Sequence, residues 1–174
     1  NTVITNPTTF ENVFLNTNNN FQVGAFMARY PGYMGNSLTV SAIDAGANFA
    51  NWTVNSVNVS GYFNGAPGTS SQAAAAGAAN DEIHVIVVDS GGMFTGVKNT
   101  VLEVFPYLSK GSDATDSLGN SNYYKNYIFN NSKYIYAVDP MDYANTVSTW
   151  GRPLSNNNFQ TVPAAQTVTF TEGK

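Results

Sequence analysis

The acidic side chains are the first residues in this sequence whose types and spacing could do chemistry. Asp81, Glu82 and Asp89 flank one apolar run, and Asp113 and Asp116 share a polar stretch. Adjacent residues of a strand point to opposite faces, so Asp81 and Glu82 diverge. Asp113 and Asp116 lack the third oxygen ligand and the terminal glutamate of a calcium loop. We therefore predict no metal site and interpret these carboxylates as loop caps and solvated strand ends.

His84 is the only histidine, and the chain has no cysteine. These counts exclude a multi-histidine metal site and a thiolate nucleophile. A Ser-His-Asp triad stays formally open, but there is no Gly-x-Ser-x-Gly elbow and His84 lies inside an apolar run. Gly91 and Gly92 are not followed by Gly-Lys-Ser/Thr, which argues against a phosphate loop. We predict a packed, hydrogen-bonded histidine, no catalytic residue and no cofactor.

Aromatic side chains offer a second kind of site, a stacking platform for sugar rings. Aromatic residues make up 13% of the chain, which suits a carbohydrate- or surface-binding β-domain with Trp52, Tyr62 or Tyr33 as the platform. Such a site needs two or three aromatic rings that converge on one open groove. The sequence instead spreads its aromatic residues through predicted strands and helix faces. This binding module is the alternative function, and an enzyme with a cleft around His84 comes third.

The composition excludes two other classes of partner. Only 10% of the residues are charged, the net charge is −4, and the seven basic residues form no cluster. Phosphate binding relies on clustered Lys and Arg, so we predict no nucleic-acid partner. No apolar run approaches the roughly 20 residues of a membrane span, so we predict no membrane partner either. Neutral polar surfaces of this kind are typical of secreted, fibrous and virion proteins.

The first half of the chain predicts short elements separated by turns. Thr8 and Glu11 have the spacing of a capping box, which indicates a short helix with Phe10 on its buried face. Pro31 and Gly32 predict a type II turn, because proline presets φ and glycine accepts a positive φ. Residues 38–43 alternate as a strand with one buried face, and residues 51–63 form a looser strand region.

The second half contains the strongest strand signals. Residues 82–89 are apolar on both faces, which predicts a central strand, and residues 100–105 should return as its neighbour. Asn122 is positioned to cap a helix that ends at Asn130 and Asn131, and residues 134–138 form another strand. Residues 65–80 are Gly, Pro, Ser and Ala, which favours a mobile surface loop.

These elements predict an α+β fold, a β-sandwich-like mixed sheet flanked by a few short helices. Residues 1–174 should form a single domain. The chain starts at Asn1 rather than Met, and a strand-like alternation is still running down at residues 169–174. We therefore expect this domain to be a segment of a larger structural protein.

Three ordered blocks of the sequence resemble one known family. They are ARYPGYMGNSLTV (28–40), DEIHVIVVD with GMFTG (81–89 and 92–96), and a discontinuous run of VLE, LSKGSDA, SNYYK and SKYI (101–103, 108–114, 121–125 and 132–135). These blocks resemble the contractile tail sheath proteins of bacteriophages, in particular those of T-even-like myophages. The resemblance covers about residues 4–138 and is poorer from residue 139 onward. Residues 65–80 have no specific counterpart.

The resemblance implies a structural role. Sheath proteins form stacked hexameric rings around a tail tube, and the stack contracts to drive the tube into a host cell. This segment is similar to a middle or outer domain, upstream of the core domain that ties neighbouring subunits together. Its implied partners are copies of itself, together with tail tube and baseplate proteins that it meets through parts mostly outside this segment. The implied location is the virion, after assembly in the bacterial cytoplasm. The family has no catalytic residues to transfer.

Overall fold

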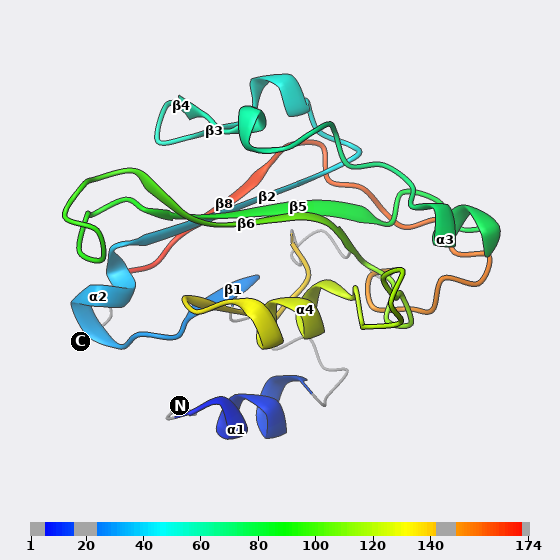
Figure 1. Ribbon diagram of the computed structural model, residues 1–174, viewed down its shortest axis with the longest axis horizontal. Coiled ribbons are helices and arrows are strands. Elements are labelled where there is room, and N and C mark those ends of the chain that lie inside the picture. Colours follow the sequence, from blue (N-terminus) through cyan, green and yellow to red (C-terminus); the bar gives the residue numbers. More distant parts are fainter. Residues whose placement is uncertain (1–5, 16–23, 142–148, 172–174) are drawn as a thin grey trace.

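Four antiparallel strands form the central sheet of the computed structural model, which describes residues 6–15, 24–141 and 149–171. The strand order is β6-β5-β2-β8, and two smaller pairs, β1-β7 and β3-β4, lie on either side of this sheet (Figure 1). The predicted α+β class, a sheet flanked by a few short helices, is confirmed. In chain order the elements are α1 (Pro7–Phe10), a π-helical turn (Glu11–Leu15), β1 (Phe26–Ala28), α2 (Gly32–Asn36), β2 (Leu38–Asp44), a 3-10 turn (Phe49–Asn51), β3 (Thr53–Val54), β4 (Val57–Asn58), a second 3-10 turn (Ser60–Tyr62), α3 (Ser71–Ala75), β5 (Glu82–Asp89), β6 (Thr100–Ser109), α4 (Tyr124–Asn131), β7 (Ile135–Ala137) and β8 (Gln166–Thr169).

Strand β5 is the centre of the fold, as its two apolar faces predicted. Ile83, Val85 and Val87 pack into a core that the sheet shares with β1, α4 and β7. Ile86 and Val88 point to the opposite face and pack into a second core beneath the β3-β4 pair. The sheet is therefore covered on both faces, and both sets of alternate side chains of β5 are buried.

Strand β2 was predicted to have one buried face, and this prediction was wrong. All seven residues of β2 are buried, because β2 lies between β5 and β8 and is covered on both faces. Leu38 and Val40 enter the first core. The opposite face carries Ser41, whose hydroxyl oxygen accepts a 2.9 Å hydrogen bond from the indole Nε1 of the buried Trp52. The polar residues of β2 thus have partners inside the protein instead of solvent.

Strand β6 returns beside β5, as predicted, and pairs with it in antiparallel register. Helix α4 packs on the same core as β6 through Tyr124 and Ile128, which are i and i+4 neighbours on one helix face. The helix ends at Asn131 as predicted, but its capping residue was predicted wrongly. Tyr123 occupies the N-cap position, and the Asn122 side-chain amide donates instead to the carbonyl oxygen of Tyr107 on β6.

The first helix forms where it was predicted, but with a different cap. The side chain of Asn6, not Thr8, accepts the hydrogen bond from the Thr9 backbone N–H, so the helix begins at Pro7. Proline suits this first position, where the helix needs no N–H. Phe10 is buried in a small aromatic cluster, with its ring 4.1 Å from that of Tyr136 on β7.

One strand prediction and one loop prediction also need correction. Residues 51–63 form a tight β3-β4 hairpin and a 3-10 turn instead of one long strand region. Residues 65–80, predicted as a surface loop, contain helix α3, which is capped by the Ser70 side chain. Ala73 and Ala78 from this stretch are buried in a third small core. Small side chains can fill a narrow space against a neighbouring segment, which composition alone does not reveal.

Gly32 carries the first testable prediction, because it has a φ of +69° directly after Pro31, as the predicted turn requires. Gly32→Val is expected to lower the free energy of unfolding by roughly 1–3 kcal/mol, since valine is strained at positive φ. Urea unfolding measures the change. Gly61→Val is the matched control, because Gly61 has open space around the position of a Cβ and no positive φ. Equal unfolding midpoints for the two variants would refute the turn assignment.

Candidate functional site

Asp89 was interpreted as a solvated strand end, and the structure corrects this interpretation. Its side chain is fully buried at the end of β5 and lies inside a loop that wraps around it. One carboxylate oxygen accepts hydrogen bonds from the Ser37 hydroxyl and from the N–H groups of Gly92 and Met93. The other accepts from the N–H groups of Phe94 and Thr95 and from the Thr95 hydroxyl, all between 2.9 and 3.0 Å. Burial opposes ionisation, but these donors lower the pKa of Asp89.

Asp81 is likewise buried instead of solvated. Its carboxylate accepts hydrogen bonds from the Ser70 N–H and hydroxyl and from the Ser109 hydroxyl, and so joins the start of α3 to the end of β6. Glu82 accepts from the Gly68 N–H, and its burial raises its pKa above the ordinary value. Both carboxylates therefore bind the segment before α3, Asp81 at Ser70 and Glu82 at Gly68, and together they hold this segment to the start of β5.

Asp113 and Asp116 are exposed and act as loop caps, as the sequence predicted. Asp113 accepts a hydrogen bond from the Leu154 N–H. Asp116 accepts from the N–H groups of Leu118 and Asn120, which closes a tight turn. Across the described ranges, no group of three or more His, Asp or Glu side chains is arranged to hold a metal ion.

His84 is a packed, hydrogen-bonded histidine, as predicted. The Tyr107 backbone N–H donates to its Nδ1 at 3.0 Å, so Nε2 carries the proton and donates to the Gly65 carbonyl oxygen at 2.8 Å. The ring also stacks on Phe63 at 4.4 Å. Burial lowers the pKa of His84, so the ring is neutral near pH 7. Both ring nitrogens are occupied within the protein, which leaves neither for a general base.

A buried ion pair between Asp44 and Lys110 is the main feature that the sequence analysis missed. The two side chains are fully buried, and Lys110 Nζ donates to Asp44 Oδ2 at 2.8 Å. Lys110 also donates to the carbonyl oxygens of Asn80 and Gln160, at 2.9 and 3.0 Å. Asp44 accepts from the N–H groups of Gly46 and Val162. Burial lowers the pKa of Lys110, and the Asp44 charge opposes that shift.

This ion pair fixes the C-terminal segment to the sheet. Lys110 Nζ also lies 4.7 Å from the ring centroid of Trp150, a cation–π contact. The pair therefore joins the ends of β2 and β6 to residues 150–162. No local sequence pattern predicts the Asp44–Lys110 ion pair, because the two residues are 66 positions apart in the sequence. All three Lys110 protons and both Asp44 oxygens have hydrogen-bond partners within the protein, so the pair serves to hold the structure together.

The proposed sugar-stacking residues do not converge as one platform. Trp52 is buried with its indole N–H bonded to Ser41, so its face is unavailable to a ligand. Tyr33 and Tyr62 are exposed, and they belong to α2 and to the second 3-10 turn.

In the part of the chain that the structure describes, no helix is long and apolar enough to cross a membrane.

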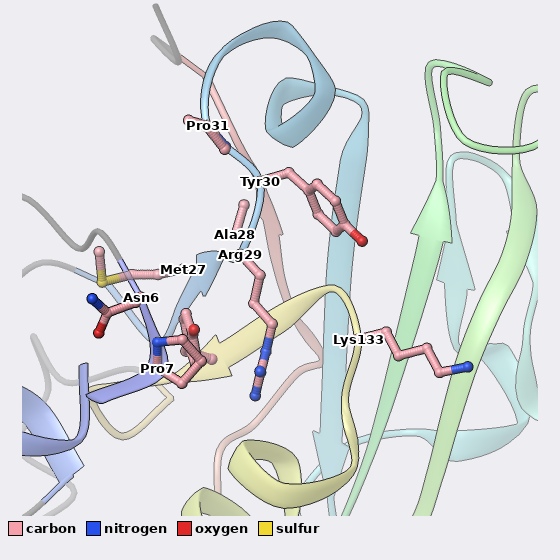
Figure 2. Close-up of a pocket in the computed structure, with 9 residues that line it drawn as sticks. Asn6, Pro7, Met27, Ala28, Arg29, Tyr30, Pro31 and Lys133 are labelled. Carbon is pink, nitrogen blue, oxygen red and sulfur yellow. The ribbon is translucent and has the colours of Figure 1, made fainter. Parts of the chain in front are cut away.

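A surface pocket of about 470 Å³ lies beside β1, between the start of α1 and the loop before β7 (Figure 2). Its lining includes Pro7, Arg29, Tyr30 and Lys133. Figure 2 shows that the Arg29 side chain lies beside Pro7, whereas the Lys133 side chain extends away from Arg29 and Pro7. The pocket is open and cationic, which suits a contact with another macromolecule better than the enclosure of a small molecule.

The Arg29 side chain in this pocket is held by hydrogen bonds and by a cation–π contact. Its Nε donates to the Ile135 carbonyl oxygen at 2.9 Å, and its Nη2 donates to that of Phe129 at 2.6 Å. The guanidinium carbon lies 4.1 Å from the ring centroid of Tyr136. Partial burial lowers the pKa of Arg29, and nearby Tyr136 and Glu103 oppose that shift. An arginine held in this way presents a positive charge at low cost in side-chain entropy.

Comparison with protein-family models and with curated proteins finds no match for this chain.

Proposed function

We propose that this chain is a structural domain of a contractile phage tail sheath, a middle or outer domain of a larger subunit. In this proposal the subunits assemble in stacked hexameric rings around the tail tube and contract to drive the tube into the host. The partners are other copies of the subunit, and the tail tube and baseplate proteins are met through other parts of it. The location is the virion, after assembly in the bacterial cytoplasm.

The observation that carries the proposal is where the three family-like blocks lie in the fold. Residues 28–40 contain α2 and the start of β2, residues 81–96 contain β5 and the loop around Asp89, and the third block begins on β6. These blocks supply β5 and parts of β6 and β2, which are adjacent in the central sheet. Segments that are far apart in sequence thus form one packed unit, which supports a resemblance to a folded domain.

The use of the polar residues supports a structural role over catalysis. Asp44, Asp81, Asp89, His84 and Lys110 are all buried, and each is held by hydrogen bonds from other segments of the same chain. Catalytic groups are instead expected in a cleft with free hydrogen-bonding capacity. A buried network of this kind fixes one arrangement of strands and loops. A rigid domain is what a mechanical assembly requires of its parts.

Electron microscopy tests the proposal. The complete subunit that carries this segment, expressed in a bacterial host, is expected to form tubes with six-fold rings in negative stain. The 174-residue chain alone is expected to sediment as a monomer in analytical ultracentrifugation. A stable protein–protein interface buries about 1,600 Å² in total, and in this proposal the domain that ties neighbouring subunits together lies outside the 174 residues.

Two outcomes would contradict the proposal. If the complete subunit formed no array of any kind, the sheath role would fail. If the 174-residue chain alone built tubes or stable hexamers, its assignment as a middle or outer domain would fail, because the elements that drive polymerisation would then lie inside it. A saturable glycan ligand on a glycan array would favour the alternative function of a carbohydrate-binding domain.

A further inference from the structure

Exposed apolar side chains gather at one end of the molecule, around α2 and the loop at residues 90–99. The aromatic rings of Tyr30, Phe94 and Tyr134 contact one another, with centroids 5.0 to 6.1 Å apart, and join these segments to the loop before β7. Five of the eight large apolar side chains that are exposed in the described ranges belong to this end: Tyr30, Tyr33, Met34, Met93 and Val97. Tyr33 is the most exposed of the five, at 81%.

The same end is cationic. Lys98 lies in the loop at residues 90–99, Lys133 precedes β7, and Arg29 lines the pocket described above. Two acidic residues lie at this end, and both already accept hydrogen bonds within the protein: Glu103 from the Ser132 hydroxyl and the Lys133 N–H, and the buried Asp89 from the loop around it. We call this surface, formed by α2, residues 90–99 and the pocket of Arg29, the α2 end.

The opposite end carries an acidic loop, residues 112–120, most of which is exposed. Within residues 6–15, 24–141 and 149–171, Asp113 and Asp116 are the only exposed acidic residues. Leu118 lies on the same loop and is the most exposed large apolar residue of these ranges, at 84%. The hydrogen bonds that Asp116 accepts hold Leu118 in a fixed turn.

Strand register places the α2 end and the acidic loop at opposite ends of the sheet. Leu38 pairs with Asp89, and Asp89 pairs with Thr100, at the α2 end. Glu82 pairs with Ser109 at the other end, where the acidic loop follows β6. Strand β2 has seven residues, which separates the two ends by about 23 Å. Figure 1 shows the same separation, with α2 and the chain after β6 on opposite sides.

We propose that the acidic loop of one copy docks on the α2 end of a second copy of this chain. This inference rests on the proposed function, because it names the surfaces through which sheath domains meet. Each surface combines exposed apolar side chains with an excess of one sign of charge: the α2 end has Arg29, Lys98 and Lys133 against Asp89 and Glu103, and the acidic loop has Asp113 and Asp116 beside Arg152. The two excess charges are opposite in sign. The surfaces are not the same patch, so the contact is head-to-tail and repeats into rings or helical stacks. The contact is weak in a free domain and gains strength when the subunits are held in an array.

Cysteine trapping tests the contact, since the chain has no cysteine of its own. Met34→Cys places a thiol on α2, and Ser117→Cys places one on the acidic loop; both positions are exposed. The two proteins, one of them extended by a tag, are mixed and oxidised, and the three disulfide-linked dimers are separated by mass. Random collision gives the mixed dimer about half of the total, whereas a head-to-tail contact is expected to raise it to about nine-tenths. A mixed dimer at or below half of the total overturns the proposal.

Three variants make the test specific. Lys98→Gln with Lys133→Gln, in the Met34→Cys protein, is expected to reduce the yield of mixed dimer about 2- to 5-fold, as is about 0.5 M salt. Arg152→Gln, in the Ser117→Cys protein, is the matched control, because it removes an exposed cation beside the acidic loop and leaves the yield unchanged or higher. Leu118→Ala in the Ser117→Cys protein removes the apolar anchor and is expected to lower the yield.

The same cysteine pair separates this inference from the proposed function. It is placed in the complete subunit, and the subunit is oxidised after assembly. Arrays that form without the cross-link refute the head-to-tail contact and leave the sheath role intact. A cross-link between subunits that build no array refutes the sheath role and retains the contact.

Discussion

Lys110→Met is expected to lower the free energy of unfolding by about 3–5 kcal/mol, because it leaves the Asp44 carboxylate buried without its cation. Methionine fills a similar volume, so the loss reflects charge and hydrogen bonding more than a cavity. The carbonyl oxygens of Asn80 and Gln160 lose their donor as well. Urea unfolding followed by the fluorescence of Trp52 and Trp150, both buried, measures the change.

Two controls interpret this result. Lys98→Met makes the same chemical change at an exposed lysine and is expected to alter stability by less than about 0.5 kcal/mol. Asp44→Asn combined with Lys110→Met is expected to cost less than the sum of the two single changes, because no lone charge stays buried. Additive losses would show that the two residues do not act as a pair. An unchanged midpoint for Lys110→Met would contradict the buried ion pair itself.

Asp89→Asn is expected to destabilise the protein by about 3 kcal/mol at pH 7. Both carboxylate oxygens of Asp89 accept three hydrogen bonds each, and an asparagine NH₂ group in place of one oxygen would face donors. Asp113→Asn is the matched control, since its amide oxygen can still accept from the Leu154 N–H. The control variant is expected to unfold within about 0.5 kcal/mol of the parent protein.

The pH dependence of this effect follows from the lowered pKa of Asp89. A carboxyl with a lower pKa in the folded state stabilises the fold above its unfolded-state pKa of 3.8, and this contribution is lost as the pH falls through the folded-state pKa. The stability difference between the parent protein and Asp89→Asn should therefore be full at pH 7 and shrink below about pH 4. If the stability difference between the parent protein and Asp89→Asn stayed constant down to pH 2, the negative charge of Asp89 would not be the source of its stabilising effect on the loop.

Local sequence patterns were sufficient for the elements whose signals are short-range. The apolar run of β5 predicted a central strand, and its neighbour β6 followed from the turn between them. The end of α4 at Asn131 also followed from the local sequence. The hydrogen-bonded state of His84 was predictable because a lone histidine inside an apolar strand must find partners. The α+β class depends on these signals alone.

Helix caps could not be predicted at the level of single residues. Asn6 and Thr8 are both good caps, and Asn122 is a better capping residue than Tyr123 by type. The structure uses Asn6 and Tyr123, because the side chain of Asn122 is needed at the Tyr107 carbonyl on β6. Local and distant groups compete for the same polar side chain, and the sequence shows only the local ones.

The sequence by itself determined the central strand β5, its neighbour β6, the short first helix and the end of α4, and also that the chain has one histidine and no thiol. Only the tertiary structure decided where the charges go. It placed Asp44, Asp81 and Asp89 inside the protein, brought Lys110 to Asp44, and left Asp113 and Asp116 exposed on one loop. The physical reason is that burying a carboxylate requires donors from several segments at once. Those donors come together only when β2, β5, β6 and the C-terminal segment pack, so residue type and local spacing carry no trace of them.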